Sequence, residues 1–448
     1  MAIGLVSDRV VAGSPGPKYE PYWPVEIGID LTDIARFTKG RPWAEYARMR
    51  EAAPALWHPE PAERPGFWAV RRYKDVKRVN SDSITFSSQA GGINLALSPP
   101  GRRHESLFAA SLNAMINLDG GEHRQLRREH MPYSTAGYVK ALRAAIAGEV
   151  ERRLDVMKGR GDCDFVHSFA GHIPLFTLCE MLGIPEGDRE PFLRWIHFLE
   201  MAQQVAAEQA DKADAEMTPE LLAFIEQFNR NVEEMFAYGR DMLRHRRADP
   251  QRDLMSAIAN ARVDGDLLPD EYLDGSWLLI VFAGNDTTRN TLSGGLKLFT
   301  EATSERERLM SDASLLPNAV HEITRMVSPV IHMRRTATTE TEIAGQRIAA
   351  GEKVVMWYDA ANHDPAVFAE PERFDITRTN ADRHIAFGHG PHICFGRLTA
   401  QIQLEESYRR IFQRFPAIRW TGEIDIAPNN IVHGIRRLGV RLTSDQAS

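Results

Sequence analysis

Apolar residues recur at three- and four-residue steps along most of this chain, the spacing that gathers them on one face of a helix. From residue 122 onward this period dominates, and it predicts helices at 139–157, 185–204, 219–245, 269–301, 316–327 and 397–415. Three of these segments begin at a proline, a residue that suits the first turn of a helix. The chain is therefore expected to be built mainly from helices.

Strand-like patterns are confined to short segments towards either end. Near the start, a strand is predicted at 66–70 between helices at 42–51 and 73–80. Near the end, residues 342–348 and 353–357 flank an Ala-Gly turn and predict a hairpin. No linker, internal repeat or charge run divides the chain, so we expect one large domain at 26–448 with an N-terminal extension at 1–25. The predicted fold class is mainly α with a minor β-rich region.

Composition narrows the classes of function. Hydrophobic residues make up 43% and charged residues 26% of the 448 residues, as in ordinary globular proteins. The net charge of −7 argues against a nucleic-acid partner, and no segment has the long apolar run of a membrane span. The first twenty residues lack the pattern of a secretion signal. Cys163, Cys179 and Cys394 form no C-x-x-C pair of the kind that binds zinc.

One cysteine lies in surroundings that can keep a thiolate on an iron. Cys394 stands in a run from Phe387 to Gly396 whose glycines let the backbone approach a flat macrocycle and turn N–H groups toward the sulfur. The helix predicted at 397–415 follows at once, and its N-terminal dipole favours an anion. Such donors lower a cysteine pKa from its usual value of roughly 8.5. The alternative is that Cys394 is a small buried hydrophobe, as most free cysteines are.

A second run departs from the apolar pattern inside a predicted helix. Ala283 and Gly284 are followed by an acid, Asp286, and a hydroxyl residue, Thr287. A glycine inside a helix costs about 1 kcal/mol relative to alanine, so it usually has a reason. A carboxyl that feeds protons to a hydroxyl suits oxygen chemistry in a site that excludes bulk water. The structural alternative is that Gly284 admits a neighbouring helix while Asp286 and Thr287 are solvated.

Other charged residues stand one helical turn apart. Glu322 and Arg325 can pair on one helix face, although most such pairs are surface bridges that contribute about 0–1 kcal/mol. His123 and Arg127 have similar spacing, and the alternative for them is a solvated basic face.

These segments together resemble the cytochrome P-450 family, and the resemblance runs from about Pro42 to Leu442. The run around Cys394 matches the family motif Phe-Gly-x-Gly-x-His-x-Cys-x-Gly, and residues 283–287 match Ala-Gly-x-Asp/Glu-Thr. Thr399 and Gln401 depart from the leucine and arginine that are common in the family. The resemblance implies the cytochrome P-450 fold and a non-covalently held haem b whose axial ligand is the Cys394 thiolate.

The resemblance also implies roles for individual residues. Phe387 is expected to pack by the thiolate, Ala283 and Gly284 to lie over the haem face, Thr287 to stand beside bound oxygen, and Asp286 to belong to the proton relay. The residues expected to bind the haem propionates are His123, Arg127, Arg335 and His392, with Arg334 a rival of Arg335 by one register step. A buried structural network is expected from Glu322, Arg325 and Arg373.

The implied function is that of a bacterial, cytoplasmic haem-thiolate monooxygenase that inserts one atom of O₂ into an unreactive C–H bond. Electrons would come from NAD(P)H through a ferredoxin reductase and a ferredoxin, for which Arg124, Arg128 and Arg397 could offer a positive patch. Two alternatives stay open. A peroxygenase driven by hydrogen peroxide would not need the acid–hydroxyl pair. A haem-based sensor would need no such relay, and it usually carries an output domain.

The substrate is expected to be a lipophilic small molecule. Segments 285–290, 333–337 and 353–358 look similar to bacterial members that hydroxylate alkanes, fatty acids, terpenoids or steroid side chains, and an aromatic or macrolide-type substrate is the alternative. By family position, the residues expected to line the pocket are mostly apolar: Phe198, Met201, Phe282, Val330, Ile331, His332 and Ile431.

Overall fold

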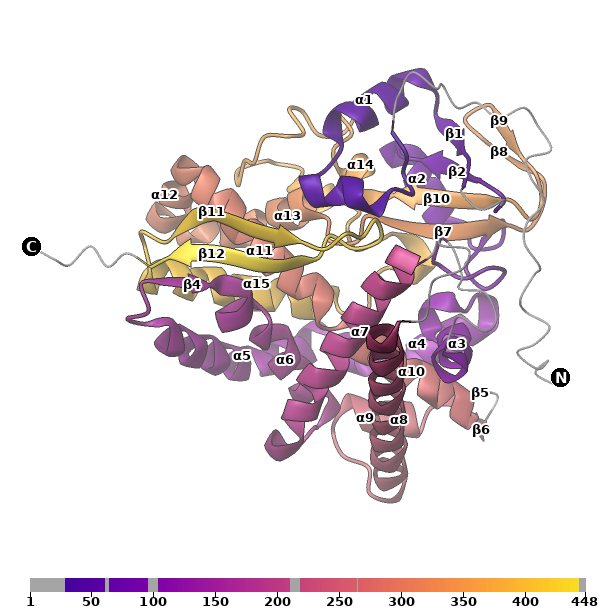
Figure 1. The fold of residues 1–448 in the computed structure, drawn as a ribbon, viewed down its shortest axis with the longest axis horizontal. Coiled ribbons are helices and arrows are strands. Elements are labelled where there is room, and N and C mark those ends of the chain that lie inside the picture. The colour runs from indigo at the N-terminus through magenta and orange to yellow at the C-terminus, as the bar shows by residue number, and fades with distance from the viewer. Residues whose placement is uncertain (1–28, 61–63, 96–103, 210–217, 264, 443–448) are drawn as a thin grey trace, which may run out of the picture.

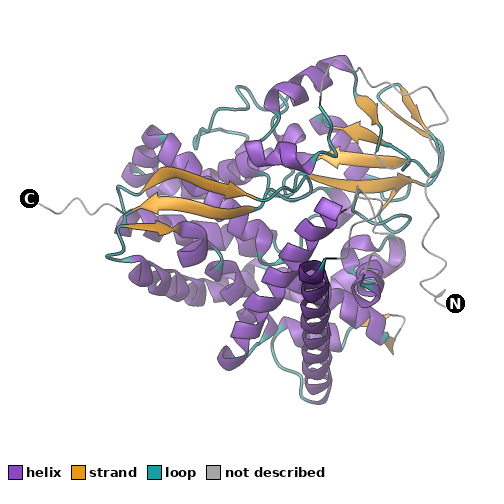
Figure 2. Ribbon diagram, in the orientation of Figure 1, coloured by secondary structure: helices purple, strands orange, loops and turns teal. Residues whose placement is uncertain are grey.

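The computed structural model describes residues 29–60, 64–95, 104–209, 218–263 and 265–442. The N-terminal extension expected at 1–25 lies outside these residues. Figure 1 shows helices over most of the molecule and a β-rich part at the upper right, where segments near both ends of the chain meet. Figure 2 shows the same division by element type. In the described part of the chain, no helix is both long and apolar enough to cross a membrane.

Apart from the one at 269–301, the predicted helices are present with small shifts at their ends. In chain order the helices are α1 Trp43–Ala52, α2 Tyr73–Ser81, α3 Glu105–Leu112, α4 Gly120–His130, α5 Ala136–Met157, α6 His172–Leu182, α7 Arg189–Gln209, α8 Pro219–Ala248, α9 Leu254–Ala259, α10 Asp270–Ala283, α11 Asp286–Glu301, α12 Thr303–Ser311, α13 Leu316–Val327, α14 Tyr358–Asn362 and α15 Arg397–Arg414. The prediction for 316–327 is confirmed at both ends.

The strands form two main sheets. The larger has the order β1 Ala55–His58, β2 Phe67–Val70, β10 Lys353–Trp357, β7 His332–Ala337 and β3 Phe86–Ser87. Among the described residues its one parallel pair, β2 with β10, joins segments that are more than 280 residues apart. The second sheet has the order β11 Arg419–Ile426, β12 Ile435–Arg441 and β4 Asp162–Asp164, and it lies over helices in Figure 1. Two short hairpins are β5 Arg262–Val263 with β6 Asp266–Leu267, and β8 Thr341–Ile343 with β9 Gln346–Ile348.

The hairpin predicted between 342–348 and 353–357 is wrong. The first segment folds back on itself, because Ala344 and Gly345 have φ of 49° and 92° and turn β8 into β9. The second segment becomes β10, which pairs with β2 on one side and β7 on the other. A buried central strand finds its partners across the fold rather than next to it in sequence.

The single helix predicted at 269–301 is two helices. The α-helical assignment stops after Ala283 and resumes at Asp286, and Asn285 takes a distorted backbone with φ −102° and ψ −58°. The Thr287 hydroxyl donates to the Ala283 carbonyl at 3.3 Å across this break. Sharp breaks in helices commonly occur where a side chain takes the place of a backbone donor. The interruption falls on the run that broke the apolar pattern.

Four groups of buried side chains hold these elements together. One contains side chains of α5, α11, α13, α15 and the second sheet. Another contains side chains of α6, α7, α8, α9 and α10. The remaining two cover the opposite faces of the five-stranded sheet. The candidate functional residues lie on α4, at the break between α10 and α11, on β7 and in the loop before α15.

Candidate functional site

The loop that carries Cys394 is closed by a backbone hydrogen bond. The Cys394 N–H donates to the Phe387 carbonyl at 2.8 Å, just before α15 begins. Gly388 and Gly390 have φ of 73° and 69°, a left-handed conformation that favours glycine. An added Cβ at Gly390 would lie 2.9 Å from the Asn80 carbonyl oxygen, so this glycine also permits close packing on α2.

The Cys394 sulfur is deeply set, yet the residue has exposed surface, so it faces a recess inside the protein. Burial raises the pKa of the thiol, whereas the N–H groups of Gly396 and Arg397 and the charge of Arg127 act in the opposite direction. The predicted donors are present, but burial outweighs them in the protein alone, and the expected lowering of the pKa is not found. A metal ion at the sulfur would deprotonate it outright.

Helix α4 brings a histidine and an arginine to the same place. His123 is buried, and its ring centroid lies 4.2 Å from that of His392. Burial, together with the charges of His392 and Arg127, lowers the pKa of His123 to about 4. The Arg127 guanidinium donates to the Ile393 carbonyl at 2.7 Å. Three of the four residues predicted to bind propionates therefore cluster at the Cys394 loop.

Asp119, which the sequence analysis did not single out, lies in this cluster. Its carboxylate accepts the His392 Nε2–H at 3.1 Å, the Ser87 hydroxyl at 2.6 Å and the Gln89 N–H at 3.0 Å. Burial by itself raises the pKa of Asp119, but these hydrogen bonds outweigh burial and lower the pKa. An aspartate directly before a helix usually indicates a cap, and this one makes no capping hydrogen bond. The sequence signal was therefore misleading.

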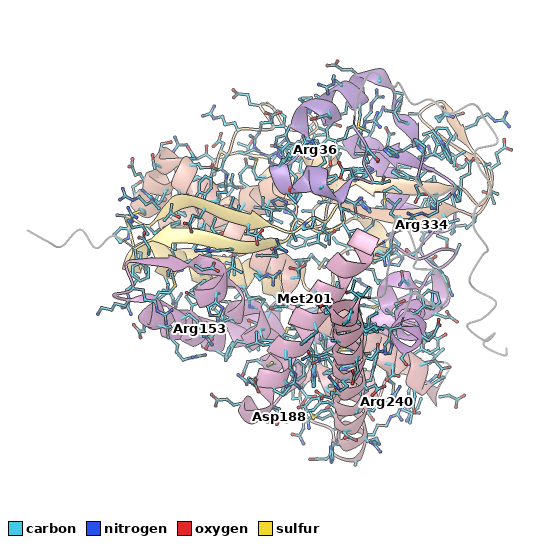
Figure 3. All side chains as sticks on the ribbon, in the orientation of Figure 1. Arg36, Arg153, Asp188, Met201, Arg240 and Arg334 are labelled. Atoms are coloured by element: carbon cyan, nitrogen blue, oxygen red, sulfur yellow. The ribbon has the colours of Figure 1, made fainter. Side chains whose placement is uncertain are left out.

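Strand β7 separates the two rival arginines. Arg335 is buried, and its charge acts on Asp119 and His392. Arg334, labelled in Figure 3, projects from the other face of the strand, where its guanidinium donates to the Thr336 hydroxyl at 3.2 Å. Successive residues of a strand point to opposite faces. The structure thus brings Arg335, and not Arg334, to the cluster at the Cys394 loop.

The basic cluster has the character of an anion site. Among the described residues, neither Arg127 nor Arg335 has a carboxylate oxygen within 4.0 Å. Burying an arginine without an ionic partner is costly, and burial lowers the pKa of both guanidinium groups. A ligand with two carboxylates next to an iron that needs a sulfur ligand would fit these donors. Haem b has this chemistry, and the residues present therefore fit it.

The break between α10 and α11 carries the second set of predicted residues. Ala283 is exposed although Val281 beside it is buried, so the break opens onto free space. The Asp286 carboxylate does not bond to Thr287; it accepts from Arg289 at 2.5 Å and from Asn290 at 2.8 Å. Both Asp286 and Arg289 keep 13% of their side-chain surface exposed. The acid and the hydroxyl are neighbours in the chain but have separate partners.

The predicted Glu322–Arg325–Arg373 network is wrong in its third member. Glu322 accepts from Arg325 at 2.7 and 2.8 Å and from the Arg378 Nε–H at 3.1 Å, with all three residues buried. The Arg373 side chain is instead exposed and pairs with Glu370 at 3.2 Å. Arg373 contributes its carbonyl, which accepts from Arg378 at 2.9 Å. The turn after Pro371 directs the earlier arginine to the surface and the later one inward.

Five of the residues predicted to line the substrate pocket keep partly exposed side chains: Phe198, Met201, Phe282, Val330 and Ile431. Figure 3 places Met201 on α7. The remaining two are corrections. Ile331 and His332 have no exposed surface, and the His332 ring packs 4.7 Å from that of Trp357. His332 shares the Arg334 face of β7, so strand alternation turns it away from the Arg335 side.

Comparison with known proteins identifies similar sequences over nearly the whole chain. A sequence model of the cytochrome P-450 family matches residues 300–421. The steroid C26-monooxygenase of Mycobacterium tuberculosis is 32% identical over 418 residues, which cover 93% of this chain and 97% of that protein. The methyl-branched lipid omega-hydroxylase of the same species is 31% identical over 442 residues, which cover 96% of this chain and 97% of that protein.

Solved structures share the fold. A Mycobacterium marinum cytochrome P-450 in complex with pseudoionone superposes with a TM-score of 0.82 at 31% identity. The match covers 95% of this chain and 100% of that one.

Proposed function

Because this chain belongs to the cytochrome P-450 family of haem-thiolate monooxygenases, we propose that it hydroxylates an unreactive C–H bond of a lipophilic substrate with O₂ and two electrons from a ferredoxin. One observation carries the proposal: a recessed cysteine sulfur whose loop lies in a cluster with the half-buried Arg127 and the buried Arg335, neither of which has a carboxylate partner in the described structure. Haem b bound through a cysteine thiolate supplies the chemistry that activates O₂ for such reactions.

In this proposal the residues of the cluster hold the cofactor. Cys394 provides the sulfur, with Phe387 packed by it, and Arg127 and Arg335 offer charged donors to the propionates. His123 and His392 add imidazole groups at the same edge. Ala283 and Gly284, the small residues at the end of α10, leave room on the opposite side.

Thr287 and Asp286 are proposed to move protons. The Thr287 hydroxyl can donate and accept, and its contact with the Ala283 carbonyl, at 3.3 Å, is long enough to exchange for a partner in the recess. Asp286 has a small exposed surface, so its carboxylate can take a proton from the solvent side. The ion pair with Arg289 fixes the position of the Asp286 carboxylate next to the break between the two helices.

Electrons are proposed to arrive at the face formed by α4 and the start of α15. Arg124 and Arg128 are exposed on α4, and Arg397 lies at the first position of α15. An acidic ferredoxin, reduced by an NAD(P)H-dependent reductase, complements this positive charge. All three cysteines are unpaired, which suits the reducing cytoplasm.

The proposed substrate is an alkane, fatty acid, terpenoid or steroid side chain. The five partly exposed residues expected to line the pocket are all apolar. Two relatives are named for steroid and methyl-branched lipid oxidation, and the similar solved structure holds pseudoionone. Spectral titration of the purified haem protein with a panel of these lipids distinguishes the classes, because a lipid that binds next to the haem would shift its Soret band.

The proposal is tested by Thr287→Ala, assayed with ferredoxin, its reductase and NADPH. Loss of the hydroxyl should leave substrate binding and NADPH consumption intact but divert most electrons into hydrogen peroxide, with at least a tenfold drop in product per NADPH. Thr300→Ala is the matched control, since the Thr300 hydroxyl also bonds to a backbone carbonyl of α11, Lys297 at 2.8 Å. It should couple NADPH to product like the parent.

Undiminished coupling in Thr287→Ala would overturn the role of this residue. Turnover by the parent with hydrogen peroxide as efficiently as with the ferredoxin system would instead identify a peroxygenase. Binding of oxygen at the haem without any turnover of the lipid panel would favour a sensor.

A further inference from the structure

A carboxylate stands inside the cluster that is suited to binding carboxylates. Asp119 lies directly before α4, and its side chain is 13% exposed. Next to two anionic propionates, an additional negative charge is unfavourable unless it serves another purpose. The hydrogen bonds of Asp119 indicate what that purpose is.

Asp119 is hydrogen-bonded to two segments that are distant from it in sequence, the Cys394 loop and residues 87–89. It accepts from His392 in the Cys394 loop, from the Ser87 hydroxyl at the end of β3, and from the Gln89 N–H. The Asp119 N–H donates to the Gln89 side-chain oxygen at 3.1 Å, so two hydrogen bonds in opposite directions link Asp119 and Gln89. The charge of Arg335 on β7 also acts on Asp119.

The contact with His392 fixes the orientation of its ring. An ionised carboxylate only accepts hydrogen bonds, so Nε2 of His392 must carry the proton that is donated to Asp119. The Nδ1 edge of the ring is then the one left to face another partner. With its side chain only 4% exposed and its ring packed against that of His123, His392 has little freedom to turn.

We propose that Asp119 is a positioning residue that orients His392 at the propionate edge of the haem and sets a negative charge there. The proposal rests on the proposed function, because it takes Cys394 as the haem ligand. Partners that orient a residue at a metal centre commonly affect affinity by about 10–100-fold. Asp119 should therefore control both how firmly haem is retained and the reduction potential of the iron.

The test compares Asp119→Asn and Asp119→Ala with the parent in the haem-loaded protein. The rate of haem transfer to apomyoglobin should rise by about tenfold in both variants, as expected for loss of an orienting partner. The reduction potential should become more positive in both, because a negative charge near the iron favours the ferric state. In a His392→Leu background, Asp119→Asn should no longer accelerate haem loss.

Asp253→Asn is the matched structural control. Asp253 also precedes a helix, is buried and pairs with an arginine, Arg246 at 2.6 Å, but its hydrogen bonds go to Arg246 and to the Ser256 N–H and not to residues of the cluster. It should lower the melting temperature and leave the potential and the haem transfer rate unchanged.

Unchanged potential and haem transfer in both Asp119 variants, with only a lowered melting temperature, would overturn the proposal. If Asp119→Ala does not fold, the nearly isosteric Asp119→Asn still decides. Failure of the proposed function would give a different result. The Cys394→Ser variant would then have the same thiolate signature in its reduced carbon-monoxide spectrum as the parent.

Discussion

A fully buried charge is stable in this protein where several donors share it. Glu322 has no exposed surface, and its two carboxylate oxygens accept from Arg325, from Arg378 and from the Asp375 N–H. Arg325 in turn donates to the Asn362 and Pro371 carbonyls, so the network anchors the segment that leads to the Cys394 loop. Removing one partner would leave a buried charge only partly compensated.

We expect Arg378→Met to reduce the free energy of unfolding by about 3–5 kcal/mol, the usual cost of breaking a buried ion pair. Arg373→Met should change it by less than about 0.5 kcal/mol, because the Arg373 side chain is exposed. Urea unfolding of the two variants, followed by fluorescence, measures the difference. Equal destabilisation by the two substitutions would contradict the assignment of Arg378 to the network.

Sequence alone could identify the residues whose chemistry is unusual for their position, such as Cys394 and Thr287. It could not decide between Arg373 and Arg378, since both follow Pro371 closely and only the path of the turn buries one of them. Asp119 was missed for a related reason. An aspartate before a helix has a common local explanation, and its real partners come from β3 and from the loop 273 residues later.

At the scale of elements, α11 packs against α15 and α13 so closely that one glycine is required. A Cβ added at Gly295 would lie 2.2 Å from the Tyr408 Oη and 2.5 Å from the Ile323 Cγ2. Tyr408 cannot easily move, because it is fully buried and its hydroxyl donates to the Leu292 carbonyl at 2.8 Å. The absence of a side chain at Gly295 therefore allows these helices to pack so closely.

Gly295→Ala should destabilise the protein by about 1–3 kcal/mol through overpacking. Gly148→Ala, in the middle of α5, is the opposite case because nothing lies within 4 Å of an added Cβ there. It should stabilise the protein by about 0.5–1 kcal/mol, the gain in helix propensity. Urea midpoints should move in opposite directions, and a shared direction would contradict this account of the α11 interface.

The helices were predictable from sequence because their apolar faces recur locally, as α13 illustrates at both ends. The break after Ala283 was not, since the departure from the apolar pattern there is equally compatible with an unbroken helix, and the Thr287 hydroxyl bond that accompanies the break is visible only in the structure. The partner strands of β10 could not be predicted from the sequence either. An all-buried strand has no alternation to fix its neighbours, and its actual partners are β2 and β7.

At the scale of the whole molecule, buried histidines make stability depend on pH. Burial lowers the pKa of His130 and His332 to about 4, and burial together with the charge of His321 lowers that of His384 to about 3. In the unfolded chain these groups titrate near 6.5. The unfolded state therefore binds more protons as pH falls below about 6.5, and stability declines from there toward the folded pKa values.

We expect the urea midpoint to be nearly constant between pH 8 and 7 and to fall between about pH 6.5 and 4. Each histidine contributes up to about 1.4 kcal/mol per pH unit in this range. His332→Leu should have a shallower decline than the parent, because one of the groups is removed. A midpoint that stays level from pH 7 to 5 would contradict the prediction.

The parallel pairing of β2 with β10 also has a consequence during synthesis. One edge of β2 can be covered by β1 at once, but the other has to wait until residues 353–356 leave the ribosome. At about 5–20 residues per second, that delay lasts roughly 15–60 s. An open strand edge is a template for pairing with other chains. The yield of folded protein in a cell should therefore depend on how this nascent edge is shielded, and not only on the stability of the finished molecule.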